Sequence, residues 1–378
     1  MKKLLFLFVL FSQNSIAQIT ISNAYFPAPK DSLRINIANS ATAKFVKISP
    51  AGTNQVWDYS FLRSANPTAP NTIEQYSTPD TGTLSAFPTA DIVRNLTNIG
   101  QKEVYNKTST RFELIGYQGF TLGLFDLPIK PVFNTPVLER RAPMSYNSTN
   151  NNASSFSVPL LVDWIPESVF SSLPVKPDSM RLRFQTTRQD KTDAWGQIRI
   201  PGGNYDVLRE RRFEVTERKV EARIAGLLWI DVTALLLSGN RPPKDTTVSY
   251  YFWSNTAKEP IAMVQFRNEQ DTVPSRVEFK FLNINTALKE NEKPSILASL
   301  FPNPTNDIIF LEIKSSKSMT YNIALLNTVG QTLLIKKEKL QSGDVLPLYL
   351  NTFKTGIYIL NMYTDEGTLL YSEKIIKE

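Results

Sequence analysis

Short runs in which apolar and polar residues alternate recur along most of the chain, and they constrain its fold more than any other feature. In the clearest run, Leu182 and Phe184 stand between Arg181, Arg183 and Gln185. A period of two residues is typical of a β-strand with one buried face, because successive side chains point to opposite faces. Turn residues separate the runs, among them 24 prolines and 15 glycines. The sequence therefore predicts an all-β protein built from antiparallel hairpins.

The pattern divides the chain into a long cargo region and a short tail. Residues 18–288 are predicted to form an antiparallel β-sandwich, either one elongated sandwich or two abutting ones, with almost no helix. Within it we expect a turn at residues 192–196 and a flexible connection at residues 147–155, where small and polar residues gather. Residues 289–295 are charged and contain a proline, which is typical of a linker. The tail then covers residues 296–378.

The N-terminus has the features of an export signal. Lys2 and Lys3 precede an apolar run that ends near Phe11, and small residues come before the junction of Ala17 and Gln18. This order predicts a signal peptide at residues 1–17, cleaved between Ala17 and Gln18. The run is too short for a permanent membrane span, so no transmembrane segment is expected in the mature chain. The chain has no cysteine, which excludes a disulfide and a lipoprotein anchor and leaves burial to stabilise the fold.

The charge balance bears on the class of partner. The chain has 42 Lys and Arg against 35 Asp and Glu, a formal net charge of +7. Basic residues alternate with glutamates along the predicted strands instead of forming a basic stripe, which argues against nucleic-acid binding. A weak attraction to anionic glycans of a cell surface is compatible with this charge.

The chain contains no histidine, and this limits the chemistry available to it. Serine or cysteine nucleophiles that depend on imidazole, and zinc or iron sites built on histidine, are excluded. Carboxylate chemistry remains, and two pairs are candidates for acid/base work: Asp163 with Glu167, and Asp190 with Asp193. Asp190 and Asp193 are also candidate calcium ligands, although no spaced Asp/Asn/Gly loop surrounds them. Exposed loop carboxylates are the plainer interpretation, and the sequence assigns no catalytic residue, cofactor or metal.

The tail has a strand pattern of its own. Ile309, Leu311 and Ile313 alternate with other residues in a first predicted strand. Gly330 lies between two further runs, where a hairpin needs a residue that accepts positive φ. Pro302 delays strand pairing because proline lacks a backbone donor.

Several separately spaced motifs in the tail resemble one family. They are Phe301-Pro302-Asn303-Pro304, Val329-Gly330-Gln331, Gly356-Ile357-Tyr358-Ile359 and the final Lys374-Ile375-Ile376-Lys377. Together they resemble the type A C-terminal sorting domain of type IX secretion, which labels exported proteins of Bacteroidota; Phe301 stands where the family more often has tyrosine. The resemblance implies that Phe301, Pro302, Asn303, Pro304, Gly330, Gly356 and Tyr358 are sorting residues.

It further implies a small Ig-like β-sandwich, partnership with the type IX translocon and its sorting machinery, and delivery through the periplasm to the outer-membrane surface or the medium. The tail is then expected to be cut off in the linker, with the cargo often transferred to surface lipopolysaccharide.

Two weaker patterns lie in the cargo region. Residues 193–209 resemble a stretch of uncharacterised secreted proteins that carry the same tail, which assigns no activity. Four Asp-Ser or Asp-Thr pairs resemble Bacteroidota O-glycosylation sites, with Ser32, Ser179, Thr246 and Thr272 as acceptors. The same pairs also favour turns before strands, because the aspartate side chain accepts backbone hydrogen bonds.

The sequence thus leaves three hypotheses for the cargo. The first is a surface-displayed module with a binding or structural role, with surface glycans as candidate partners. The second is a polysaccharide-cleaving enzyme that uses carboxylates and stacks sugar rings on Trp195 and Trp253. The third is calcium-stabilised adhesion.

Overall fold

The computed structural model describes residues 18–64, 66, 69–96, 100–122, 127–164, 167–171, 175–224, 226, 228–236, 243–282, 298–314, 318–365 and 367–378. The expected signal peptide with Ala17, and the expected linker at residues 289–295, lie outside these residues and remain predictions. Gln18, the expected first mature residue, is exposed.

Strands dominate both parts of the chain. The cargo strands are β1 (Ser32–Ile37), β2 (Gly52–Asp58), β3 (Thr72–Ser77), β4 (Ile92–Leu96), β5 (Gln101–Lys107), β6 (Arg111–Gln118), β7 (Phe120–Leu122), β8 (Leu127–Ile129), β9 (Val132–Arg141), β10 (Thr149–Leu160), β11 (Ser179–Ile200), β12 (Gly203–Arg223), β13 (Trp229–Asp231), β14 (Lys244–Trp253), β15 (Ala262–Phe266) and β16 (Arg276–Lys280). The tail strands are β17 (Ala298–Phe301), β18 (Ile308–Ile313), β19 (Met319–Asn327), β20 (Thr332–Leu340), β21 (Val345–Tyr349), β22 (Gly356–Tyr363) and β23 (Leu369–Lys377).

The helices of the described chain are single turns or little more. They are η1 (Asn23–Tyr25), α1 (Ser40–Ala43), α2 (Thr81–Ala86), η2 (Val162–Trp164), α3 (Glu167–Phe170) and α4 (Thr233–Leu236). In the part of the chain that the structure describes, no helix has the length and apolar character needed to cross a membrane. The all-β prediction is therefore correct at the level of class.

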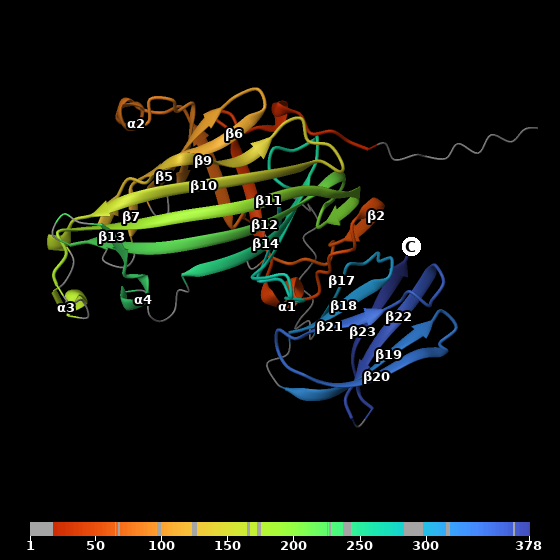
Figure 1. Ribbon diagram of the computed structural model, residues 1–378. Helices are drawn as coiled ribbons and strands as arrows, with labels where there is room; N and C mark the ends of the chain where they lie inside the picture. Colours follow the sequence, from red (N-terminus) through yellow and green to blue (C-terminus); the bar gives the residue numbers. More distant parts are fainter. Residues whose placement is uncertain are drawn as a thin grey trace, which may run out of the picture.

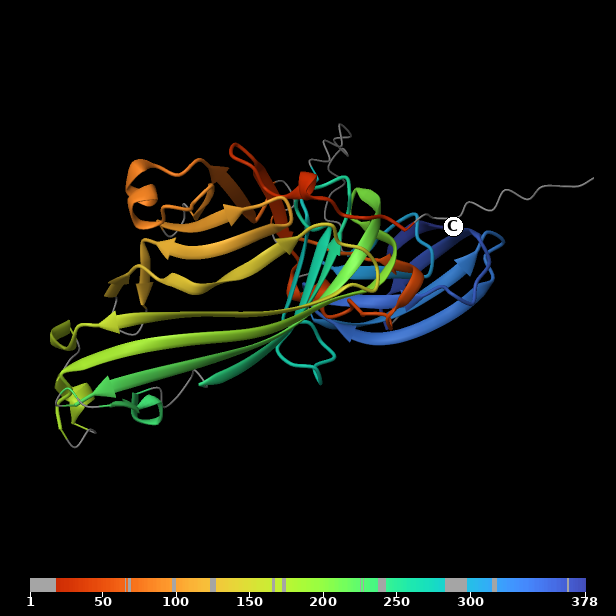
Figure 2. The same ribbon diagram turned by 45° about the horizontal axis from the view of Figure 1, so that its top comes forward.

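The predicted cargo sandwich is wrong, because the cargo strands close into a barrel. Among the described residues, 14 strands form one sheet; β2 and β13 are side branches, and the other 12 form a closed antiparallel ring. Most neighbours in the ring are also neighbours in sequence, and the seam is the pairing of β1 with β16, in which Ile35 faces Lys280. Figure 1 shows β11, β12 and β14 side by side, and Figure 2 shows them facing β5, β6 and β9 across the barrel. Alternation reports one buried face, which a sandwich and a barrel share.

Two local predictions in the cargo are also wrong. The expected turn at residues 192–196 lies inside β11, a continuous strand of 22 residues, and only a bulge between Thr192 and Ala194 marks the place. The expected flexible connection at residues 147–155 enters β10, which pairs along its whole length with β11. Small and polar residues suit these long strands because their partners supply the hydrogen bonds.

The interior of the barrel holds charged side chains as well as aromatic ones. Arg188 of β11 donates to the carbonyl of Leu138, and Arg212 of β12 donates to the carbonyl of Glu139 at 2.6 Å. Leu138 and Glu139 belong to β9, which is not a neighbour of β11 or β12 in the ring. These hydrogen bonds therefore cross the interior. Apolar clusters around Phe112 and Met180 share the interior with these charged side chains.

The sorting domain is built from two small sheets and not from the expected Ig-like sandwich. The tail forms a three-stranded sheet, β17-β18-β21, and a four-stranded sheet, β20-β19-β22-β23. Both sheets contribute to one apolar core, with Ile309 and Leu311 from the first and Ile323 and Leu360 from the second. The predicted hairpin around Gly330 is present between β19 and β20.

Candidate functional site

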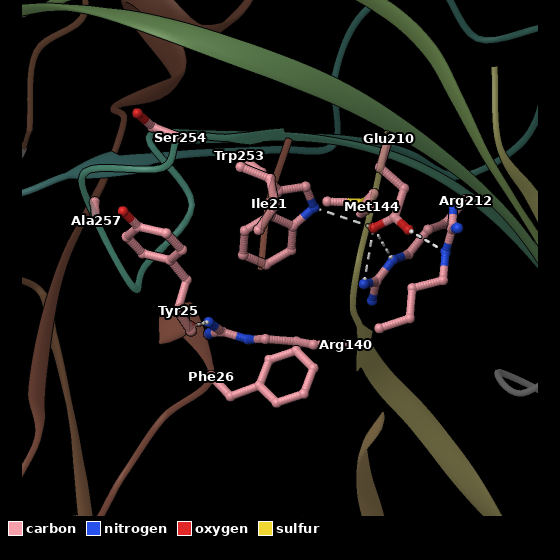
Figure 3. Close-up of a pocket in the computed structure, with 11 residues that line it drawn as sticks. Ile21, Tyr25, Phe26, Arg140, Met144, Glu210, Arg212, Trp253, Ser254 and Ala257 are labelled. Atoms are coloured by element: carbon pink, nitrogen blue, oxygen red, sulfur yellow. Dashed lines mark hydrogen bonds and ion pairs between the residues drawn. The ribbon is translucent and has the colours of Figure 1, made fainter. Parts of the chain in front are cut away.

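Glu210 is the centre of a buried charge cluster in the barrel interior (Figure 3). Arg212 donates to its Oε2, with Nε at 3.1 Å and Nη2 at 3.0 Å. Trp253 Nε1 donates to the same oxygen at 3.0 Å, and Arg141 Nε lies 3.7 Å from Oε1. The guanidinium of Arg140 lies over the Trp253 ring, 4.9 Å from its centroid. The cluster joins strands β9, β12 and β14 across the interior.

The electrostatics of this cluster keep its groups ionised. Burial opposes the charge on Glu210, but Arg212, Arg141 and Arg188 together hold the pKa of that carboxyl below its ordinary value. Burial also opposes the charge on Arg212, yet Glu210 and the groups around it raise the pKa of the guanidinium. Because its pKa is low, the Glu210 carboxylate is a fixed negative charge at neutral pH. A general acid or base needs a pKa near the operating pH, so this carboxylate is not suited to that role.

The space beside this cluster is small. The cavity between Ile21, Met144, Glu210 and Trp253 measures about 20 Å³. A water molecule needs roughly 10–15 Å³ measured in this way, so the cavity has room for about one water. The arrangement can bind a water and fix strand positions, but it offers no space for a sugar.

A second charged group lies in the interior on β3, β4 and β5. The Arg94 guanidinium donates hydrogen bonds to the carboxylates of Glu74 and Glu103, and the Tyr105 hydroxyl also donates to Glu103. Burial raises the pKa of Glu103, and Arg94 and Tyr105 offset this only in part. The hydroxyl of Tyr76 donates to Glu74 at 3.0 Å. These contacts hold three neighbouring strands in register.

The sequence did not single out these interior residues. Glu210, Arg212 and Glu214 occupy alternate positions of one strand, so they share a face. The alternation of basic and acidic residues argues against a nucleic-acid surface, and it does not by itself show that one face of the strand is buried. A charged face on a strand of 21 residues was a usable signal for a polar barrel interior.

The two carboxylates proposed as an acid/base or calcium pair are kept apart. Asp190 is 1% exposed and pairs with Arg188, with Nε to Oδ1 at 2.8 Å. Asp193 lies at the bulge and pairs with Arg209, which is 1% exposed. Arg209 also donates to the carbonyl of Ser49, which lies between α1 and β2 outside the ring of strands. Asp190 therefore belongs to the interior and Asp193 to the outer face. Among the described residues, no group of three or more acidic side chains is placed to hold a metal ion.

The other proposed pair is at the surface. Asp163 in η2 and Glu167 in α3 are both exposed, and Glu167 pairs with Lys176 at 2.9 Å. The hydrogen bond from Lys176 lowers the pKa of Glu167. An exposed carboxylate with a lysine partner fits the plainer interpretation of this pair.

The tryptophans proposed as stacking platforms are packed inside the protein. Trp253 is 7% exposed and stacks on Tyr251 with ring centroids 5.5 Å apart. Trp195 is half-buried and packs against the same cluster. Neither position favours stacking of a sugar ring from solvent.

The first sorting motif ties the start of the tail to its end. Phe301 is 2% exposed and stacks on Phe310, with centroids 5.8 Å apart. Asn303 Oδ1 accepts from the backbone N–H of Ile376 at 2.8 Å, and its Nδ2 donates to the carbonyl of Lys374. Pro302 is half-buried and Pro304 is exposed. The structure thus brings together the first and last motifs, which are far apart in the sequence.

The remaining sorting residues lie in the four-stranded sheet and its turns. Gly330 has φ of +81° in the turn between β19 and β20, where the Asn327 side chain accepts two backbone hydrogen bonds. Gly356 is the first residue of β22 and pairs with Lys377. Tyr358 is 8% exposed, and its hydroxyl donates to the carbonyl of Lys354 at 2.6 Å.

Two of the four candidate glycosylation sites, Ser32 and Ser179, begin strands, whereas Thr272 precedes β16 and Thr246 is the third residue of β14. Ser32 and Thr272 are exposed, whereas Ser179 and Thr246 are half-buried. The preceding aspartate accepts a backbone N–H in each case, from Ala28, Gly226, Thr246 and Arg267 respectively. The hydrogen bonds of Asp31 and Asp271 close local turns and agree with the turn interpretation, whereas Asp178 binds the distant Gly226 and Asp245 lies within β14. Glycosylation of all four sites stays a prediction.

Comparison with protein families identifies the tail. The model of the secretion system C-terminal sorting domain matches residues 299–378. No match is found among curated proteins, so the likeness expected for residues 193–209 stays a prediction. Residues 299–378 are therefore a type A C-terminal sorting domain, and they mark this chain as a protein that type IX machinery secretes to the cell surface or the medium.

Proposed function

We propose that the barrel is a non-catalytic binding module that holds glycans in a groove on its outer face. The groove measures about 580 Å³ and lies between residues 47–50 and strands β12, β14 and β15. Ligand sites typically measure roughly 300–1,000 Å³, so it can take a short oligosaccharide.

The lining of the groove carries the proposal. The rings of Tyr250 and Phe266 line it in an edge-to-face pair, 6.1 Å apart at 89°. Arg211, paired with Glu269, and Asp271 lie beside them. Aromatic rings bordered by polar groups suit sugars, which present apolar C–H faces and hydroxyls.

A binding assay tests this proposal. The mature protein, made without glycosylation because Thr272 also lines the groove, would be incubated with a panel of surface and dietary glycans, and retention and release of reducing ends would be measured. We expect retention of at least one glycan without release, and weaker retention by Tyr250→Ala. Tyr363→Ala, on the four-stranded sheet of the tail, is the matched control. Release of reducing ends would favour the polysaccharide-cleaving alternative, and equal retention by Tyr250→Ala would exclude this groove.

We also propose that the cargo reaches the outer-membrane surface through the periplasm, with the tail cut off in residues 289–295. Deletion of residues 301–378 should leave the protein in the periplasm, because the cargo has its own closed barrel and needs the tail as an address. Fractionation of the producing cells, with protease digestion of intact cells, measures this. Arrival of the shortened protein at the surface would contradict the proposed route.

A further inference from the structure

The three-stranded sheet of the tail buries apolar side chains on both of its faces. Ile309, Leu311 and Ile313 point into the core of the tail. Phe310, which lies between the first two, is only 1% exposed and belongs to a second apolar cluster, which includes Phe61 from the segment between β1 and β3. Phe301 and Val345 from the neighbouring strands belong to the same second cluster. A strand with two apolar faces needs cover on both sides.

The barrel supplies this cover through the segment that follows α1. The Phe310 ring lies 4.6 Å from Phe61 and 5.1 Å from Phe45, measured between centroids. Both residues belong to the stretch between β1 and β3 that carries α1 and β2 on the outside of the barrel. In Figure 1 this stretch and strands β17, β18 and β21 lie next to each other.

Polar contacts surround the aromatic centre. The guanidinium of Arg63 lies over the Phe301 ring, 4.0 Å from its centroid, in cation–π geometry. Glu312, on the same face of β18 as Phe310, attracts the Arg63 charge. Asn306 Nδ2 lies 3.5 Å from Asp58 Oδ2 at the edge. An apolar centre with a polar rim is the usual anatomy of a specific interface.

We propose that the face formed by Phe45, Phe61 and Arg63 is the docking site of the sorting domain. The occupant is the tail sheet β17-β18-β21 of the same chain. Docking holds Phe301 of the first sorting motif against the folded barrel, and removal of the tail uncovers the aromatic rings of Phe45 and Phe61.

The absence of cysteine from the chain permits a direct test in the full-length mature protein. Asp58→Cys combined with Asn306→Cys places two thiols at the edge of the interface. A short thiol-reactive crosslinker should join them within one molecule, detected by gel mobility and by mass. Asp58→Cys with Glu338→Cys is the matched control, because Glu338 lies on the four-stranded sheet, across the tail core from the barrel. The control pair should not crosslink.

Adding Phe45→Asp to the first pair tests the aromatic face itself. Loss of a half-buried phenylalanine should lower the crosslinking rate about tenfold. An unchanged circular dichroism spectrum would show that the variant folds. An unaffected rate, crosslinks formed only between molecules, or equal crosslinking of the control pair would each overturn the proposal.

Discussion

Asn303 and Ile376 are joined by a hydrogen bond of 2.8 Å from the backbone N–H of Ile376 to the side-chain oxygen of Asn303. The Asn303 amide also donates to the carbonyl of Lys374, so one side chain binds two backbone groups of β23. Thr305 continues the contact, because its N–H donates to the carbonyl of Ile376 at 2.8 Å. The first and last motifs of the sorting domain are therefore one structural unit, which gives a physical reason for asparagine at this position.

Asn303→Ala should destabilise the sorting domain. It removes two hydrogen bonds at an exposed site, for which we expect a loss of about 1–2 kcal/mol in the free energy of unfolding. Urea unfolding of the mature protein measures the loss. Asn351→Ala, at an exposed asparagine of the same domain, is the control and should change the stability little. Equal stabilities of the two variants would mean that the Asn303 contacts do not hold the end of the chain.

Gly330→Ala should weaken the β19–β20 hairpin. Gly330 has φ of +81°, and a Cβ there would meet no atom within 4 Å, so only the backbone conformation opposes the change. A left-handed conformation costs an L-residue roughly 1–2 kcal/mol. Gly330→Asn should lose less, because asparagine tolerates this region. Thermal unfolding of the three proteins should rank them glycine, asparagine, alanine, and any other order would contradict the argument.

Asp193→Ala should be among the most damaging single changes in the cargo. It leaves the guanidinium of Arg209 buried beside Trp57 and Tyr250 without its carboxylate. Removing one partner of a buried ion pair costs about 3–5 kcal/mol.

A second variant separates charge from packing. Asp193→Leu combined with Arg209→Met should lose less stability than Asp193→Ala alone, because it buries no unpaired charge. Urea unfolding of both proteins makes the comparison. A larger loss in the double variant would mean that the pair stabilises the bulge through its own attraction.

The sequence predicted the class of the fold and the identity of the tail, but not the closure of the barrel. Class follows from local alternation, and the tail motifs are short and contiguous. Closure depends on the pairing of β1 with β16, in which Ile35 faces Lys280. These residues are far apart in the chain, and no local sequence pattern shows that they pair. The length of β10 has no local signal for a related reason, because its polar residues are accommodated by pairing with β11.

The candidate sites divide in the same way. The sorting residues could be named from motifs, although their contacts could not. Glu210 and Arg212 were missed because a charged residue in a strand is usually exposed, and only a closed interior turns it into a buried pair. The short spacing of Asp190 and Asp193 predicts one pair, whereas the bulge between Thr192 and Ala194 directs them to separate arginines.

Glu214 should make the stability of the barrel depend on pH. Burial raises the pKa of Glu214 above the ordinary value of 4.5. The folded state therefore keeps this proton at pH values where the unfolded state has already released it. Its contribution therefore becomes less favourable as the pH rises from 4.5 through the raised pKa. Glu214→Gln should gain stability relative to the parent over this window, and the difference should vanish below it.

Glu210→Gln is the matched control for this pH dependence. The pKa of Glu210 is lowered below 4.5, so its stabilising contribution is present above that value and is lost as the pH falls through the lowered pKa. This variant should be less stable than the parent at neutral pH, and the gap should close in acid. Urea unfolding on both sides of pH 4.5 compares the two, and the same sign for both variants would contradict the assignment.

Gly196→Ala should displace β2 from the barrel. Gly196 lies in β11 opposite Gln55 of β2, and a Cβ built there would come well inside 3.0 Å of the Gln55 backbone oxygen and nitrogen. The backbone of β2 must move, because no flexible side chain can yield, and overpacking of this kind costs about 1–3 kcal/mol. Gly82→Ala in α2 is the control, since its nearest neighbour would be a side-chain oxygen at 3.5 Å, and alanine in a helix is neutral or stabilising. Hydrogen exchange of the amides in Gly52–Asp58, measured together with urea unfolding, should show faster exchange only in Gly196→Ala. If exchange in β2 stays at the parent rate, the close approach of the two strands does not position β2.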